Sequence, residues 1–170
     1  MVMRRMMMSS KDDTNVPLYP YSPFTYSPSN AVWRFQADSH ISATTSANSK
    51  TVYAGNIVGN RSTAHSTSWP VWFTLLAGDE WELKIKNITY TASTNANNYC
   101  NVYLYTTDGT SAIGSNQISF GSGEGTTNDL TFTGTMTADK SINAIRFTIY
   151  RSVNPLEFDI EFWVNGQRYF

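Results

Sequence analysis

The sequence predicts an all-β domain, built as a two-sheet antiparallel β-sandwich with an extended amino-terminal arm in front of it. From about residue 31 onward, apolar residues recur with a period of two in short runs separated by turn signals, and no stretch shows a helical repeat. About eight to ten such runs without intervening helices favour a sandwich. Only 15% of the 170 residues are charged, whereas 21 Thr, 19 Ser and 15 Asn supply neutral polarity suited to exposed sheet surfaces.

Residues 1–30 form the predicted arm, and residues 31–170 form the predicted sandwich domain. Four of the six prolines lie in the arm, and each one fixes its own φ and favours extended geometry in the residue before it. The arm also carries aromatic side chains that need a partner to cover them, either the sandwich itself or a neighbouring subunit. These candidate partner-binding residues are Tyr19, Tyr21, Phe24 and Tyr26.

The expected strands of the sandwich are, in chain order, 32–37, 51–58, 71–76, 81–90, 101–107, 117–120, 130–136, 142–151, 156–164 and 167–170. Among the turns between them, Asn165-Gly166 is the strongest signal, because a two-residue hairpin turn requires φ > 0 at both positions. This turn should pair residues 162–163 with residues 168–169. The glycine-rich segment 121–125 is expected to be a flexible loop.

The strand expected over 156–164 places apolar residues on one face and the acidic row Glu157, Asp159 and Glu161 on the other. Carboxyl groups at this spacing suit the acid and base pair of a glycosidase. A solvated sheet face, however, lacks the apolar pocket that raises the pKa of a catalytic acid. We therefore expect cross-strand ion pairs and no catalytic residue. The basic partners expected for the row are Lys84, Lys86 and Arg146.

Charge and residue counts exclude several classes of function. The 12 basic and 13 acidic residues give a net charge of −1, which lacks the positive footprint of a nucleic-acid or anionic-membrane binder. Two histidines and one cysteine are too few for a zinc site, and no metal or cofactor motif is present. The alternative is an oxygen-only calcium site in the loops around Asp108 and Asp129, although no spaced Asp/Asn/Glu loop motif occurs there. The single Cys100 cannot form an internal disulfide and is expected to be a buried structural thiol.

The amino terminus predicts the compartment of synthesis. Its first ten residues, MVMRRMMMSS, contain no apolar stretch of the length found in secretory signals. No run of about 18 apolar residues occurs elsewhere in the chain. We expect synthesis in a host cytoplasm without a signal peptide, and no membrane partner.

Several aromatic residues alternate with core positions and should stand on outer sheet faces, where they could contact a glycan or another protein. These candidate contact residues are Tyr103, Tyr105, Tyr150 and Trp163. Packing against the arm or the core is the alternative for each of them.

Two segments resemble a known type of domain. They are LLAGDEWELKI at 75–85, and the pair that runs from FT at 132–133 through TADK at 137–140 to IRFTIY at 145–150. Both are similar to strands of carbohydrate-binding-module-like jelly rolls, a type that recurs in tail and capsid accessory proteins of bacteriophage virions. The resemblance covers about residues 70–164 and consists of turn and strand chemistry, so it transfers no sugar-binding residue.

These observations lead to two expectations about function. The first is a non-enzymatic structural protein of a bacteriophage virion, such as a capsid decoration, head fibre or tail accessory protein. Its arm would anchor it to other virion structural proteins, and it would form a homo-oligomer. The alternative is a carbohydrate-binding module or receptor-binding domain that recognises surface glycans, with Tyr103, Tyr105 and Trp163 as a stacking platform.

Overall fold

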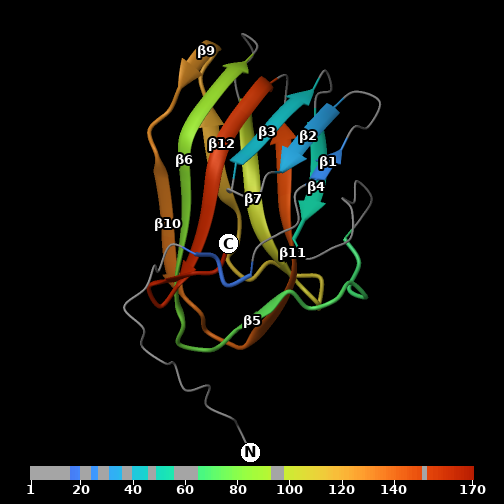
Figure 1. Cartoon of the computed structure of the whole chain (residues 1–170), viewed down its shortest axis with the longest axis vertical. Coiled ribbons are helices and arrows are strands. Elements are labelled where there is room, and N and C mark those ends of the chain that lie inside the picture. The colour runs from blue at the N-terminus through green and yellow to red at the C-terminus, as the bar shows by residue number, and fades with distance from the viewer. Residues whose placement is uncertain are drawn as a thin grey trace, which may run out of the picture.

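The chain folds into two antiparallel β-sheets that pack face to face, as Figure 1 shows. This computed structural model describes residues 16–19, 24–26, 31–35, 40–45, 49–55, 65–92, 98–150 and 153–170. All described strand pairs are antiparallel. The predicted all-β sandwich is therefore confirmed. The described residues contain no helix of the length and apolar character needed to cross a membrane.

The larger sheet has eight strands. Six of them lie side by side in the order β1 (Phe24–Tyr26), β2 (Ala31–Phe35), β3 (His40–Thr45), β12 (Val153–Val164), β6 (Glu80–Ala92) and β10 (Leu130–Thr135). The other two are β13 (Gln167–Arg168), which pairs with β12, and β9 (Gly123–Thr126), which pairs with β6. The long strands β6 and β12 form the centre of this sheet, at the front of Figure 1.

The smaller sheet has five strands and lies behind the larger one in Figure 1. Its main path runs β4 (Ser49–Ala54), β11 (Lys140–Tyr150), β7 (Asn98–Thr106) and β8 (Asn116–Phe120), and β5 (Phe73–Leu75) also pairs with β11. The central strand β11 thus has a paired strand on each side, β4 on one and β7 on the other.

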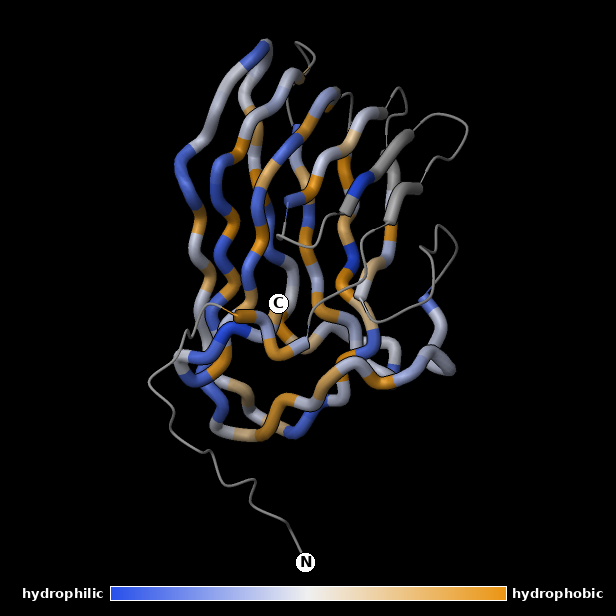
Figure 2. The backbone as a smooth tube through the Cα atoms, in the orientation of Figure 1, coloured by the Kyte–Doolittle hydropathy of each residue, from blue (hydrophilic) through white to orange (hydrophobic). Residues whose placement is uncertain are grey.

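Strict alternation of side chains fills the space between the sheets. Every second residue of β7 is buried and the residues between them are half-buried, and the same alternation runs along β12. Figure 2 shows it as alternating hydrophobic and hydrophilic stretches along the long strands. The inward face of β12 is the one predicted, and its members Leu156, Phe158, Ile160, Phe162 and Val164 are all buried.

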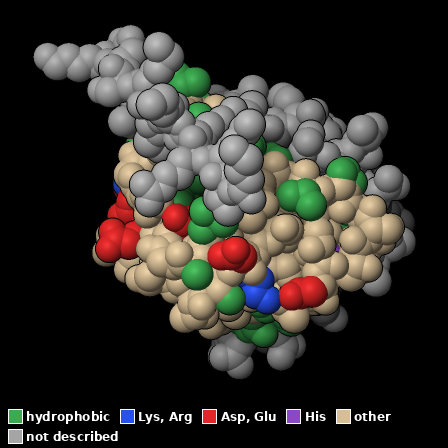
Figure 3. Space-filling model, turned by 90° about the horizontal axis from the view of Figure 1, so that it is seen from below, with side chains coloured by type: hydrophobic (Ala, Val, Ile, Leu, Met, Phe, Trp, Pro, Cys, Tyr) green, Lys and Arg blue, Asp and Glu red, His purple; other side chains and the backbone are tan. Residues whose placement is uncertain are grey.

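The lower end of the sandwich in Figure 1 is closed by the carboxyl terminus and by residues 16–19. The backbone N–H groups of Leu18 and Tyr19 donate to the carbonyls of Arg168 and Tyr169 at 3.1 and 2.7 Å. Exposed large hydrophobic side chains belong to the segments at this end, which Figure 3 views from below. They are Val16, Leu18, Val71 and Leu76.

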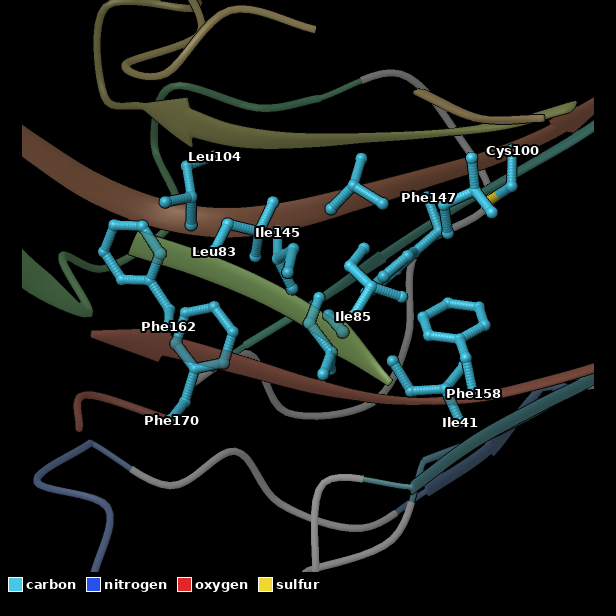
Figure 4. Close-up of a cluster of buried hydrophobic side chains, with 14 of the residues drawn as sticks. Ile41, Leu83, Ile85, Cys100, Leu104, Ile145, Phe147, Phe158, Phe162 and Phe170 are labelled. Carbon is cyan, nitrogen blue, oxygen red and sulfur yellow. The ribbon is translucent and has the colours of Figure 1, made fainter. Parts of the chain in front are cut away.

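Aromatic and aliphatic side chains from both sheets meet in one core. Figure 4 shows Leu104, Ile145 and Phe147 of the five-stranded sheet opposite Leu83, Ile85, Phe158 and Phe162 of the eight-stranded sheet. Phe170, the last residue of the chain, is 1% exposed and stacks on Phe162 at 5.5 Å and on Trp72 at 4.9 Å between ring centroids. The terminal residue is thus a core residue.

The hairpin between β12 and β13 forms as predicted. Asn165 and Gly166 have φ of 50° and 77°, the left-handed values that a two-residue turn of this kind requires. Trp163 pairs with Arg168, the Tyr169 backbone N–H donates to the Phe162 carbonyl at 2.6 Å, and the Phe162 N–H donates to the Phe170 carbonyl at 2.9 Å. The side chain of Asn165 also accepts a bond from the Glu80 backbone N–H at 2.9 Å, which ties the turn to the start of β6.

Three strands differ from the prediction. The glycine-rich segment expected to be a flexible loop contains β9, which pairs with β6. Gly125 leaves room for Tyr90, because a Cβ at this glycine would lie 2.9 Å from the Tyr90 hydroxyl oxygen. The strand β3, with the sequence HISATT, was not predicted, because it offers just two apolar residues, Ile41 and Ala43, both of which are buried. The strand β1 lies within the predicted arm and pairs with β2.

Candidate functional site

The outer face of the five-stranded sheet carries an unusual set of side chains, which we call the tyrosine face. Cross-strand pairing arranges them in rows: Tyr53, Arg146 and Tyr103 form one row, and Ala144 faces Tyr105 in the next. Further along, Thr148 lies between Thr51 and Asn101, and Tyr150 lies opposite Tyr99. The tyrosine face comprises Thr51, Tyr53, Tyr99, Asn101, Tyr103, Tyr105, Gln117, Ser119, Ala144, Arg146, Thr148 and Tyr150. Of these, Tyr53, Ala144 and Thr148 are buried.

Arg146 is the centre of the tyrosine face. Its guanidinium carbon lies 4.8 Å from the ring centroid of Tyr103 and 5.6 Å from that of Tyr105, at cation–π distances. Its Nη1 donates to the Tyr105 hydroxyl at 2.6 Å, and its Nε donates to the Thr148 hydroxyl at 3.0 Å. These four contacts hold the guanidinium in one orientation between the two tyrosines.

The two ends of the tyrosine face are also aromatic. At one end, the rings of Tyr99 and Tyr150 stack with centroids 4.3 Å apart and an interplanar angle of 25°. At the other end, the edge of Trp69 meets Tyr53 at 5.4 Å, and His65 lies 4.8 Å from Tyr105. Rings therefore line the sheet surface over most of the length of β7.

The segment that carries His65 and Trp69 is tied to the sheet by hydrogen bonds. The Nε2 atom of His65 lies 2.7 Å from the side-chain oxygen of Asn143, and the Asn143 amide donates to the Ser66 carbonyl at 3.2 Å. Asn143 itself is 1% exposed, at the irregularity in the pairing of β11 with β7. Burial raises the pKa of Tyr53 above its ordinary value, although the positive charge of Arg146 opposes this effect.

Of the four predicted contact residues, the structure brings three together. Tyr103, Tyr105 and Tyr150 all lie on the tyrosine face, whereas Trp163 lies on the outer face of the eight-stranded sheet. The two surfaces are on opposite sides of the sandwich. A single platform of Tyr103, Tyr105 and Trp163 is therefore wrong, because β7 and β12 belong to different sheets.

Trp163 lies in a different chemical setting. Its indole N–H donates to Glu161 at 2.9 Å, and the Lys84 ammonium lies 4.5 Å from the ring centroid. A hollow of about 390 Å³ lies beside it, lined in part by Glu80, Glu82, Thr133, Thr135 and Asn165. Three carboxylates, those of Glu80, Glu82 and Glu161, thus lie around Trp163, in contrast to the tyrosine face.

Lysines lie opposite two members of the acidic row, as expected, and one of these members forms an ion pair with a lysine. Asp159 and Glu161 lie opposite Lys86 and Lys84 on β6, and the Lys86 ammonium lies 3.0 Å from Glu161. Arg146 is not a partner of this row, because β11 lies in the other sheet. That expectation is wrong, since sequence alone does not assign a strand to one of two sheets.

The hydrogen bonds of the acidic row do not resemble those of a catalytic acid. Burial raises the pKa of Glu161, but hydrogen bonds from Lys86 and Trp163 and the positive charges of Lys86 and Arg168 outweigh it, so the pKa lies below its ordinary value. A general acid requires a shift in the opposite direction. Asp159 is bonded to His40 at 2.9 Å and to the Asn87 amide at 2.6 Å.

Of the predicted arm residues, the structure describes the side chain of Tyr19. Its ring contacts Phe73 and Tyr169, with centroids 5.4 and 5.1 Å away. Tyr21 lies outside the described residues. Phe24 and Tyr26 belong to β1, but their side chains are not described. Tyr19 thus packs on its own sandwich, one of the two alternatives expected for the arm.

The remaining candidate groups lie within the core or in turns. Cys100 is buried, and its burial raises the pKa of the thiol far above its ordinary value. Hydrogen bonds from Thr106, Thr110 and Lys140 lower the pKa of Asp108, which organises the turn after β7. Among the described residues, no three His, Cys, Asp or Glu side chains gather closely enough to hold a metal ion.

Sequence reasoning missed several members of the tyrosine face. Tyr99 has the same parity as Tyr103 and Tyr105, so extending the predicted strand by two residues would have included it. Arg146 alternates with core residues on β11 and was assigned to the wrong sheet. His65 and Trp69 come from a segment without periodicity, and no signal in the sequence places them here.

Comparisons with known proteins give distant likenesses. No protein-family model matches the sequence, and no curated protein matches it. The chain is similar to the enzymatically active domain of tailspike protein 4 of bacteriophage CBA120, with a TM-score of 0.45 and 9% identity over 85% of this chain and 19% of that chain. It is also similar to BiXyn10A CBM1 in its apo form, with a TM-score of 0.38 and 11% identity over 86% of this chain and 92% of that chain. This chain therefore spans about a fifth of the tailspike structure, and at these identities neither likeness assigns a family to it.

Proposed function

We propose that this domain is a non-catalytic binding module that recognises carbohydrate on the tyrosine face. The observation that carries the proposal is the placement of Arg146 between Tyr103 and Tyr105 on a sheet surface that has no carboxylate among its described strands. Aromatic rings offer flat apolar surfaces against which the C–H face of a sugar can stack. Hydroxyl, amide and guanidinium groups beside those rings supply the directional bonds that fix its orientation.

The polar groups of the tyrosine face suit this role. Asn101 donates to the Tyr103 hydroxyl at 3.1 Å. Thr148 is only 2% exposed, so its hydroxyl supports the surface from beneath: it accepts from Arg146 and lies 3.0 Å from the Thr51 hydroxyl. These groups are neutral and already held by neighbours, so a ligand meets a surface that is ordered before it binds. Such preorganisation lowers the entropy cost of binding.

A glycan array with point variants tests the proposal. The wild-type domain should bind a defined set of glycans, and Tyr105→Ala should weaken that binding by roughly ten- to a hundredfold, which corresponds to about 1–3 kcal/mol. Trp163→Ala is the matched control on the opposite face and should leave the binding unchanged. A blank array, or loss of binding in Trp163→Ala but not in Tyr105→Ala, would overturn the proposal.

A second candidate function, which is compatible with the first, is attachment to a bacteriophage virion as a structural protein. It is favoured by the exposed Val16, Leu18, Val71 and Leu76 at the lower end, where residues 16–19 meet the carboxyl-terminal hairpin. Several exposed hydrophobic side chains at one end of a domain are typical of a surface that another protein covers. The partner would be another virion protein or a second copy of this chain.

Mass spectrometry of purified particles tests this second candidate. The chain should be present in particles, and a variant with Leu18→Ser and Leu76→Ser should be soluble and folded but absent from them. Removal of residues 1–15 is a better truncation than removal of residues 1–30, since the longer one deletes Tyr19 and β1 as well. Full incorporation of the double serine variant would count against attachment through this end.

A further inference from the structure

Arg146 differs from the described lysines in having no negative partner. Lys84, Lys86 and Lys140 each lie within 3.0 Å of a carboxylate oxygen. Arg146 is half-buried, and no carboxylate among the described residues pairs with it. A partly desolvated cation without a counter-charge is costly, so this position favours a ligand that supplies the charge.

The bonds of Arg146 use only part of its donor set. The Nε group donates to Thr148 and the Nη1 group donates to Tyr105, and both acceptors are neutral hydroxyls. An arginine side chain has further N–H groups on Nη1 and Nη2 in a planar fork, and these have no acceptor among the described residues. A planar carboxylate matches that fork with two parallel hydrogen bonds.

We infer that the ligand of the tyrosine face is an acidic carbohydrate whose sugar carboxylate pairs with Arg146. The inference rests on the proposed function and narrows it to the class of carboxylate-bearing sugars, which includes hexuronates and sialic acids. Tyr103 and Tyr105 flank the guanidinium, so a sugar bound through its carboxylate has a ring on either side to stack against. On the other outer face, Lys84 and Lys86 already pair with Glu82 and Glu161, so neither lysine lacks a counter-charge that a sugar carboxylate could supply.

The experiment compares matched pairs of acidic and neutral sugars by titration calorimetry on the whole chain. One pair is an oligogalacturonate and its carboxyl-reduced counterpart, and a second pair is sialyllactose and lactose, so the two sources of carboxylate are distinguished. The wild type should bind the acidic member of at least one pair about tenfold or more tightly than the neutral member, as a charge-assisted bond implies. Raising the salt concentration should reduce this difference.

Variants test whether the Arg146 side chain causes the preference for acidic sugars. Arg146→Gln should bind the acidic and neutral members equally, and Arg146→Lys should recover part of the preference, because it keeps the charge but loses the planar fork. Arg34→Gln is the matched control, since Arg34 is exposed on β2 in the other sheet, and it should behave as the wild type. Thermal unfolding of each variant checks that the fold is retained.

The outcomes separate the inference from the proposed function. Equal binding of acidic and neutral members by the wild type would overturn the inference and leave carbohydrate binding intact. A preference that survives in Arg146→Gln, or a preference for sulfated over carboxylated sugars, would also overturn it. If no sugar of either kind binds, the proposed function fails and the inference fails with it.

Discussion

A close contact with a tryptophan ring explains why position 134 is a glycine. Gly134 of β10 lies beneath the indole of Trp81, and a Cβ at this position would lie 2.7 Å from the Trp81 ring. Trp81 in turn stacks on Phe162 at 6.4 Å between centroids. The missing side chain at Gly134 therefore lets the indole lie flat across the edge of the sheet.

We expect Gly134→Ala to destabilise the domain by about 1–3 kcal/mol, the usual cost of forcing extra volume into a packed site. Urea unfolding at neutral pH measures the change in the free energy of unfolding. Thr133→Ala, at the exposed neighbouring position, is the control and should change it by no more than about 0.5 kcal/mol. Equal stability of Gly134→Ala and the wild type would show that Trp81 moves aside without cost.

At the scale of elements, an ion pair links the two central strands of the larger sheet. The ion pair between Lys86 of β6 and Glu161 of β12 is half-buried, and Trp163 donates to the same carboxylate. Because the pKa of Glu161 is lowered in the folded protein, the ionised form favours the fold. This contribution is complete above the ordinary pKa of glutamate, about 4.3, and is lost as the pH falls through the lowered value.

We expect Glu161→Gln to reduce the acid sensitivity of the domain. Between pH 7 and about pH 3, the wild type should lose more free energy of unfolding than the variant, since only the wild type must protonate a carboxylate that the fold keeps ionised. Urea unfolding over this pH range measures both slopes. Glu157→Gln, on the same outer face of β12, is the control, and a Glu161→Gln slope identical to that of the wild type would contradict the assignment.

At the scale of the whole molecule, the two ends of the described chain close the sandwich together. Tyr19 packs on Phe73 and Tyr169, and Phe170 fills the space between Phe162 and Trp72. Tyr19 and Tyr169 are 150 positions apart in sequence. The lower end of the core is therefore built from residues near both ends of the described chain.

We expect Phe170→Ala to destabilise the domain by about 3–5 kcal/mol, as for other buried phenylalanines. Leu76→Ala, with a side chain 54% exposed at the same end of the molecule, should change stability by no more than about 0.5 kcal/mol. Thermal and urea unfolding measure both. A small effect of Phe170→Ala would mean that the terminal residue packs without contributing to the core.

Some features of the fold and of the site could be predicted from the sequence, and others could not. The alternation in β12 and β7 was sufficient to assign which side chains are buried, and Asn165-Gly166 was sufficient to assign the hairpin, because both depend on local backbone geometry. The short strands β1, β3 and β9 were missed, because their own sequences carry too little local signal; β3 and β9 are held by pairing with β12 and β6. His65 and Trp69 were missed for the same reason.

The sequence by itself determined the class of fold, the inward face of each long strand and the absence of paired cysteines, since these follow from residue type and a period of two. Only the tertiary structure decided which strands share a sheet. That decision separated Trp163 from Tyr103 and Tyr105, paired the acidic row with Lys86, and placed Arg146 among tyrosines instead of carboxylates. The physical reason is that a strand's alternation defines two faces but carries no information on its neighbours, which long-range packing selects.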